Sequence, residues 1–190
     1  MYEKGLRRRQ EILDRAIEVF AARGAQGTSL RAIGEAIGVS HAALKHYFDS
    51  REELLIEVYR AAEERLVAED EPETTVVGIM TSAARRNHSV PGLVQLYSTL
   101  VASALEAGHE PARQFFSARF AGLREMLIGR ITEEQRAGRI RPDITPGAAA
   151  ALIIAASDGL QTQWLLDPEV DIEESLTLLE ALLSTSTPVP

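Results

Sequence analysis

One short segment in the first quarter of the chain carries side chains that can bind the edges of DNA bases. His41, Ala42, Lys45 and His46 share one face of a predicted short helix, and Ala43 lies near the edge of that face. A histidine ring nitrogen can donate to or accept from a base edge, and an alanine methyl can contact a thymine methyl. The face is small and polar near its start, so the helix can enter a major groove about 12 Å wide.

Such a helix must be held at a steep angle by a second helix, and the preceding residues predict one. Helices over residues 28–37 and 40–48 would meet at a tight turn. Gly34 lets their backbones approach closely, and Gly38 tolerates the positive φ of the turn. This spacing predicts a helix-turn-helix; the alternative is a plain helical hairpin in which the second glycine only ends a helix. The angle is expected to be locked by apolar residues at inward positions, namely Leu30, Ile33, Ile37, Val39 and Leu44.

Polar residues at the expected helix starts support these boundaries. Thr28 and Ser40 are predicted N-caps, because their side-chain oxygens can accept hydrogen bonds from free backbone N–H groups. Ser50, followed three residues later by Glu53, matches a capping box that opens a long helix over residues 51–70.

Helical periodicity continues along the chain, and no segment shows the sustained alternation of strands. The sequence therefore predicts an all-α fold of about nine helices. We expect a helix-turn-helix domain over residues 1–50 and a ligand-binding and dimerisation domain over residues 51–190, with the helix over 51–70 linking the two. The remaining helices are expected over residues 8–23, 74–87, 91–107, 111–138, 146–166 and 171–184.

The distribution of charge agrees with a DNA-binding head. The whole chain has a formal net charge of −8, which by itself is unfavourable for binding nucleic acid. Residues 1–50 hold eight Lys or Arg and six Asp or Glu, whereas the rest of the chain holds 12 and 22. A mildly basic head thus precedes an acidic body that would stay away from the phosphates.

The segment from Gly27 to Leu55 resembles the signature of tetracycline-repressor-type (TetR/AcrR family) regulators. The match is strong over residues 8–60 and is carried by Gly38-Val39-Ser40, Tyr47-Phe48 and Ser50-Arg51-Glu52-Glu53-Leu54; the later stretch from Asp158 to Pro168 resembles the penultimate helix of many such regulators. The resemblance implies a regulator, most often a repressor, that binds a palindromic operator in double-stranded DNA as a homodimer. It also implies release from DNA by a small apolar or amphipathic effector.

The resemblance further implies roles for single residues of the motif. Contacts to phosphates are expected from Thr28, Lys45 and Tyr47, with backbone donors at the helix start after Ser40. The bases are expected to be faced by His41, Ala42, Ala43 and His46. Lys45 departs from the family pattern, which often has an aromatic residue at this position. Its ammonium can replace the aromatic hydroxyl as a contact to a phosphate. The base preference of other family members therefore cannot be assumed for this chain.

Some of these residues have an equally simple structural interpretation. His46 can be a half-buried polar residue beside Tyr47, and Phe48 is expected to pack in the core rather than contact DNA. Arg7-Arg8-Arg9 can form an arm that reaches phosphates or the minor groove, or belong to a solvated, disordered terminus.

The body of the chain has wide apolar stripes, which predict a buried helical bundle. Aromatic and methionine side chains commonly line ligand cavities, although a plain packed core is the alternative for each residue. A cavity is expected mainly because of the family resemblance. Its candidate lining residues are Met80, Tyr97, Phe116, Phe120, Met126 and Trp164, with Asn87, His88 and Gln161 as polar candidates.

The last two helices, over residues 146–166 and 171–184, are expected to form the homodimer interface. Alanines at 148–151 permit close helix approach, and Ile172, Leu176, Leu179 and Leu183 recur as in a helix-packing seam. Two such helices from each subunit would place two heads roughly 34–36 Å apart, one turn of DNA. The alternative is that these helices only cover their own core.

Motifs of other functional classes are missing from the sequence. The four histidines are scattered, and there is no HExxH pairing, glycine-rich phosphate loop, nucleophile elbow or cysteine. We therefore expect neither an enzyme nor a cofactor nor a metal site. The longest apolar run, from Ala148 to Ala156, is too short to span a bilayer, and no apolar signal core follows the basic N-terminus, so the expected location is the cytoplasm. The main alternative function is a constitutive architectural or nucleoid DNA-binding protein without a ligand switch.

Overall fold

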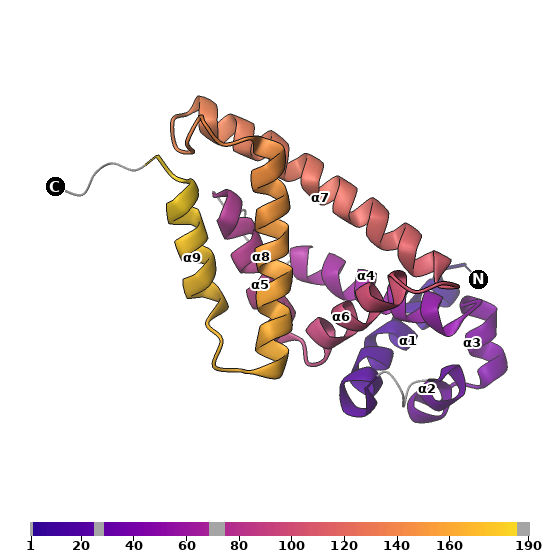
Figure 1. Ribbon diagram of the computed structural model, residues 1–190. Coiled ribbons are helices and arrows are strands. Elements are labelled where there is room, and N and C mark those ends of the chain that lie inside the picture. The colour runs from indigo at the N-terminus through magenta and orange to yellow at the C-terminus, as the bar shows by residue number, and fades with distance from the viewer. Residues whose placement is uncertain (1, 25–28, 69–74, 186–190) are drawn as a thin grey trace. The chain divides into compact units, whose positions relative to one another are not determined.

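Helices make up most of the structure, a computed structural model that describes residues 2–24, 29–68 and 75–185. An isolated β-bridge joins Ile140 to Ser184, and the described residues form no strand. The prediction of an all-α fold of about nine helices is confirmed. The helices, labelled in Figure 1, are α1 (Tyr2–Arg23), α2 (Leu30–Ile37), α3 (His41–Tyr47), α4 (Arg51–Ala68), α5 (Val76–Ser89), α6 (Leu93–Ala104), α7 (Glu110–Arg136), α8 (Pro146–Leu166) and α9 (Ile172–Leu183).

Two details at the start of the chain differ from the prediction. The N-cap of α2 is Ser29, whose side chain accepts a hydrogen bond from the Ala32 N–H at 3.1 Å, and Thr28 lies outside the described residues. Helix α1 begins at Tyr2, so residues 7–9 are helical and form neither an extended arm nor a disordered terminus. The prediction of Thr28 as the N-cap was wrong by one residue, because serine and threonine are both good N-caps and stand next to each other here.

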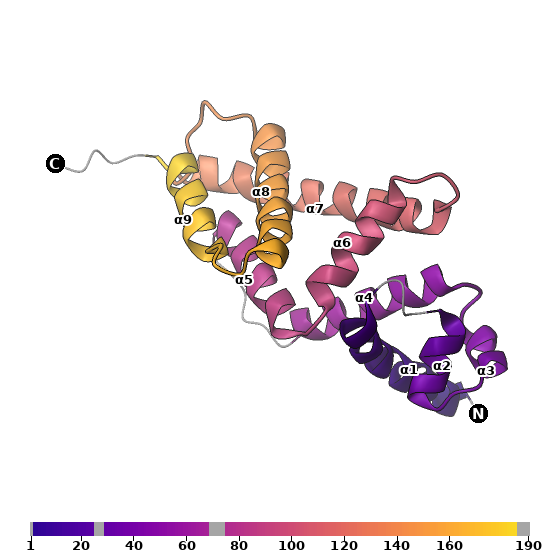
Figure 2. The same cartoon turned by 60° about the horizontal axis from the view of Figure 1, so that its bottom comes forward.

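The chain divides into two compact units, and the first contains residues 1–70 and 87–117. Helices α1 to α4 and α6 belong to it, together with the last residues of α5 and the first of α7. Helix α2 packs against α1 and against α3, as Figure 2 shows. Gly92, before α6, has a φ of +80°, and a Cβ placed on it would lie 2.7 Å from the Ala21 Cα of α1. This close approach fixes α6 against α1 within the unit.

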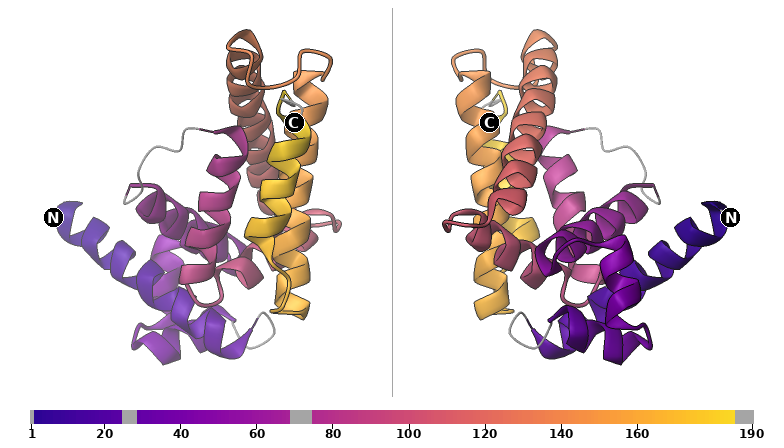
Figure 3. Two further views of the ribbon diagram at one scale, coloured as in Figure 1. Left: turned by 90° about the vertical axis from the view of Figure 1, so that its left-hand side faces the viewer. Right: turned by 90° about the vertical axis from the view of Figure 1, so that its right-hand side faces the viewer.

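The second unit contains residues 71–86 and 118–190. Helices α8 and α9 run side by side in it, as the two views of Figure 3 show. The Arg85 guanidinium of α5 donates two hydrogen bonds, each 2.9 Å long, to the Glu173 carboxylate of α9. The core of the unit is built from buried apolar residues on four helices, among them Val76, Met80, Leu127, Ile131, Ile153, Ile154, Ile172 and Leu176.

These units are defined by packing and differ in extent from the functional domains expected at residues 1–50 and 51–190. Helix α4 packs with α1 and with α6 inside the first unit. The helix expected to link two domains is therefore part of the unit that carries the helix-turn-helix. The functional division of the chain stays a prediction.

Candidate nucleic-acid interface

Helix α3 presents the surface expected to meet DNA. The Ser40 side chain caps it by accepting a hydrogen bond from the Ala43 N–H at 3.1 Å. Leu44 is fully buried and fixes the inner side of the helix. The opposite side exposes four of the predicted residues, namely His41, Ala42, Lys45 and His46.

The turn before α3 has the geometry that its two glycines predicted. Gly38 ends α2 with a φ of +70°, in the left-handed region. A Cβ placed on Gly34 would lie 2.6 Å from the Val39 carbonyl oxygen and 3.2 Å from Leu44 Cδ1. Because only a glycine allows this approach, α2 and α3 can meet at the close angle of a helix-turn-helix. The apolar residues expected to lock the angle are all buried, namely Leu30, Ile33, Ile37, Val39 and Leu44.

Contacts from α1 hold the motif in place, and the sequence did not reveal them. Arg15 donates from Nη1 to the Ile37 carbonyl oxygen at 2.7 Å, which satisfies a free acceptor at the end of α2. The Arg9 guanidinium lies 5.2 Å from the ring centroid of Phe48, directly after α3. Arg9 also donates to the Glu57 carboxylate of α4 at 2.6 Å. Arg9 thus connects Phe48, at the end of α3, with both α1 and α4.

The start of α4 is capped almost as expected. Ser50 Oγ accepts a hydrogen bond from the Glu53 N–H at 3.0 Å, but the Glu53 carboxylate accepts from the Asp49 N–H at 2.6 Å. In the predicted capping box, the Glu53 carboxylate would instead have accepted this second hydrogen bond from the Ser50 N–H. Burial lowers the pKa of Arg51 from its ordinary value, although Glu52 opposes this shift.

The charged side chains near the exposed face of α3 differ in whether they form an ion pair. Arg31 on α2 is paired with Glu35 at 2.9 Å, and this hydrogen bond raises the pKa of the arginine. Lys45 forms no ion pair with any residue that the structure describes. An exposed ammonium without a counter-charge is suited to a phosphate oxygen of DNA.

Comparisons with known proteins agree with this geometry. The model for "Bacterial regulatory proteins, tetR family" matches residues 12–58, and the model for "BetI-type transcriptional repressor, C-terminal" matches residues 95–187. The chain belongs to the TetR family of transcriptional regulators. It is therefore a regulator rather than an enzyme.

Three proteins similar to this TetR-family chain match it over most of their length. The HTH-type transcriptional repressor Rv1474c of Mycobacterium tuberculosis is 27% identical over 154 residues, which cover 80% of each chain. The HTH-type transcriptional repressor AcnR of Corynebacterium diphtheriae is 26% identical over 184 residues, or 95% of this chain and 94% of that protein. The structure of NalD, the secondary repressor of the MexAB-OprM multidrug efflux pump in Pseudomonas aeruginosa, superposes with a TM-score of 0.71 at 21% identity, over 97% of this chain and 100% of that one.

Two of the other predicted DNA contacts of this TetR-family member are less exposed. Ala43 and Tyr47 are half-buried, and the rings of Tyr47 and His46 meet edge to face at 5.2 Å between centroids. Phe48 is buried, as expected for a core residue. The roles given to these side chains in binding DNA stay predictions.

Residues predicted to line a ligand cavity fall in both units. Tyr97 and Phe116 belong to the first unit, where their ring centroids lie 5.6 Å apart and Tyr59 packs against both. Asn87 is half-buried in the same unit. These rings fill space by packing on one another, which is the arrangement of a core.

The remaining candidates belong to the second unit. Met80 and Gln161 are buried, and the Gln161 amide donates to the Ser157 carbonyl oxygen at 3.3 Å. Phe120 and Trp164 are partly buried against the core of the unit. Met126 is 43% exposed on α7, which does not favour a place in an enclosed cavity. The ligand site as a whole stays a prediction.

Two other findings concern function. Among the described residues, no three His, Asp or Glu side chains come together as they would around a metal ion. Within the same residues, no helix combines the length and the apolar character needed to cross a membrane.

Proposed function

We propose that this TetR-family chain is a ligand-responsive repressor that binds a palindromic operator as a homodimer. The observation that carries this proposal is the exposed face of α3, held by a buried Leu44 and a turn that only glycine permits. A rigid helix with small and polar residues at its start is the element that helix-turn-helix proteins place in the major groove. Such a protein acts where the DNA lies, in the cytoplasm.

Repression is supported by the names of the relatives. Both Rv1474c and AcnR are named transcriptional repressors, and each is matched over at least four fifths of its length. A repressor needs only to occupy its operator, and the exposed α3 face provides the means to do so.

Dimerisation is supported by an apolar surface on α8 and α9. Leu152, Leu178 and Leu182 are each more than 60% exposed, and Ala151 and Ala155 are exposed on the same side of α8 as Leu152. Exposed leucines gathered on two adjacent helices are typical of a protein–protein interface. A second copy of the chain could cover them as a four-helix interface.

The α9 residues that the sequence predicted for this interface do not lie on the exposed surface. Ile172, Leu176 and Leu183 are buried in the core of their own unit, and Leu179 is partly buried against it. For these four residues the alternative was correct, because they cover their own core. The proposed interface therefore uses the neighbouring face of α9.

We further propose that a small apolar or amphipathic effector releases the protein from DNA by changing the position of α4. This helix follows the motif directly, and its Glu57 pairs with Arg9 of α1, which also lies on Phe48 at the end of the motif. An effector can shift the equilibrium only if it binds the two states with different affinity.

The experiment that tests this function selects binding sites for the full chain from random double-stranded DNA. The expected sites are palindromes whose half-sites are about 10 base pairs apart, or a multiple of that distance. Small molecules that co-purify with the protein, identified by mass spectrometry, should then lower affinity for the selected site. Binding that depends on salt but not on sequence would contradict the proposal and indicate an architectural DNA-binding protein. Unchanged affinity at saturating ligand would contradict the switch alone.

A further inference from the structure

A cleft of about 300 Å³ lies within the second unit, between the start of α5, the end of α7 and the end of α9. Its volume is within the range of small-molecule sites. Val76, Ile140 and Leu183 give it an apolar lining, and Glu134, Arg139 and Glu180 supply charge. None of the residues predicted for the effector cavity lines this cleft, so it is a separate feature.

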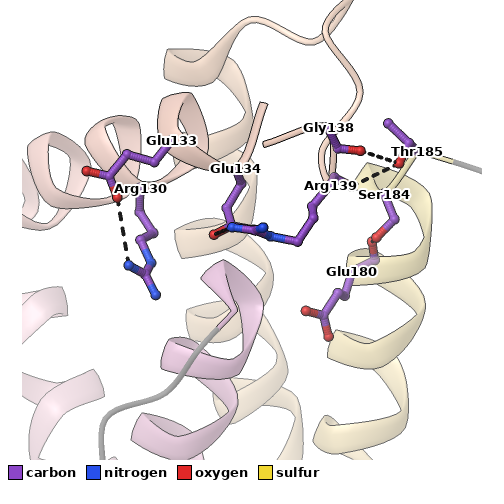
Figure 4. A network of polar contacts seen from close by, with 8 residues as sticks. All are labelled: Arg130, Glu133, Glu134, Gly138, Arg139, Glu180, Ser184 and Thr185. Carbon is purple, nitrogen blue, oxygen red and sulfur yellow. Dashed lines mark hydrogen bonds and ion pairs between the residues drawn. The ribbon is translucent and has the colours of Figure 1, made fainter. Parts of the chain in front are cut away.

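Within the cleft, Arg139 and Glu134 form an ion pair in which each charge is neutralised by the other. Arg139 donates from Nε and Nη2 to both carboxylate oxygens of Glu134, and the Nη2 bond is 2.8 Å long (Figure 4). This hydrogen bonding holds the pKa of Glu134 below its ordinary value, so both partners are charged at neutral pH. The buried carboxylate and the arginine that covers it together contribute no net charge.

Glu180 is different, because its carboxylate has no partner among the described residues. It is half-buried and lines the cleft from α9; Figure 4 shows it on the side of α9 that faces the Arg139–Glu134 pair. The structure gives this carboxylate no hydrogen bond and no ion pair with any described residue. A carboxylate partly removed from water is stabilised by a positive charge or by hydrogen-bond donors. The cleft therefore has a net charge of about −1 and free acceptor oxygens.

We propose that this cleft binds a small organic cation, an ammonium or guanidinium group with N–H donors on a short apolar body. The N–H groups donate to Glu180, and the apolar body packs against Val76, Ile140 and Leu183. An anion is disfavoured, because the charge of Arg139 is already neutralised and Glu180 would repel a second carboxylate. The site does not depend on the proposed repressor function.

Calorimetric titration of the full chain with hexylamine at pH 7 tests this site. The expected result is saturable binding at one site per chain, with a dissociation constant of about 1 mM or lower for so small a probe. Hexanol and hexanoate share the same alkyl chain and should bind at least about tenfold more weakly, because they lack the positive charge. Equal affinity for the three probes, or no binding of hexylamine, would overturn the proposal.

Two matched variants locate the binding on Glu180. Glu180→Gln keeps the shape of the side chain and should weaken hexylamine binding at least about tenfold. Glu174→Gln removes the same charge from an exposed position of α9 outside the cleft and should leave affinity unchanged. Undiminished binding by Glu180→Gln would refute the site.

Hydrogen exchange of the unmodified protein gives a second measurement that needs no variant. Hexylamine should slow exchange of amides at residues 138–140 and 183–185, which border the cleft. Protection confined to other residues would place the cation elsewhere and overturn the proposal. None of these readouts involves DNA, so their failure is distinguishable from failure of the repressor function.

Discussion

Lys45 is the residue of the α3 face whose contribution to DNA affinity is simplest to isolate. Its ammonium is exposed and has no ion pair among the described residues, whereas Arg31 on the preceding helix is paired with Glu35. A contact from an ammonium to a phosphate adds affinity that does not depend on sequence.

Replacing this lysine should therefore weaken binding to all DNA sequences alike. For Lys45→Ala, the slope of log affinity against log salt concentration should fall in magnitude by about 0.9 for each phosphate that the lysine neutralises in the wild-type complex. Fluorescence anisotropy with operator and random duplexes at several salt concentrations measures both effects. Arg124→Ala, which removes an exposed charge from α7, is the control and should leave the slope unchanged. A weakening restricted to one base position of the operator would instead show that Lys45 contacts a base.

Other single residues differ in how far the sequence could predict them. Gly38 and Phe48 were predictable, because a tight turn requires a positive φ and a large aromatic side chain favours burial. Arg9 was expected to reach DNA or to lie in a disordered terminus, yet it lies on Phe48 and pairs with Glu57. Its partner is 48 residues away, so no local pattern indicated the contact.

At the scale of the helices, the close crossing of α2 and α3 requires that Gly34 has no Cβ. A Cβ on Gly34 would come within 2.6 Å of a backbone oxygen, and a backbone atom cannot move aside as a flexible side chain can. The helix pair must open if that position is filled.

Gly34→Ala should lower the free energy of unfolding by about 1–3 kcal/mol, because the added methyl overpacks the crossing. It should also reduce operator affinity, since α3 would no longer be held at its angle. Urea unfolding followed by circular dichroism and an anisotropy titration measure the two effects. The matched control is Gly129→Ala on α7, where a Cβ meets nothing within 4 Å and helix propensity should raise stability by up to about 1 kcal/mol. Equal behaviour of the two variants would show that the close approach is unimportant.

For the molecule as a whole, the exposed leucines of α8 and α9 bear on the number of chains in the functional protein. A lone chain leaves Leu178 and Leu182 more than half exposed. A second copy that covers them would remove this apolar area from water.

Leu178→Glu should therefore convert a dimer into a monomer, because burying an unpaired carboxylate in an apolar interface costs several kcal/mol. Light scattering coupled to size-exclusion chromatography gives the mass directly. Leu105→Glu is the control, since Leu105 is 81% exposed in the first unit, outside the proposed interface, and the variant should keep the wild-type mass. A wild-type mass for Leu178→Glu would exclude this face as the interface.

The order of residues along the chain was enough to predict the helix-turn-helix, the all-α class and the family. The motif and the fold class rest on short-range physics: the periodicity of apolar residues, the caps at helix starts, and two glycines four positions apart. The family rests instead on the resemblance of the segment from Gly27 to Leu55 to a known signature. The packed fold was needed to show which leucines of α9 face their own core, because residues at three-and-four spacing on two faces give similar patterns. It was needed as well for the contact of Arg9 with Phe48 and Glu57, and for the place of Glu180 in a cleft beside a completed ion pair. Such contacts join residues far apart in the chain, and only packing brings their atoms together.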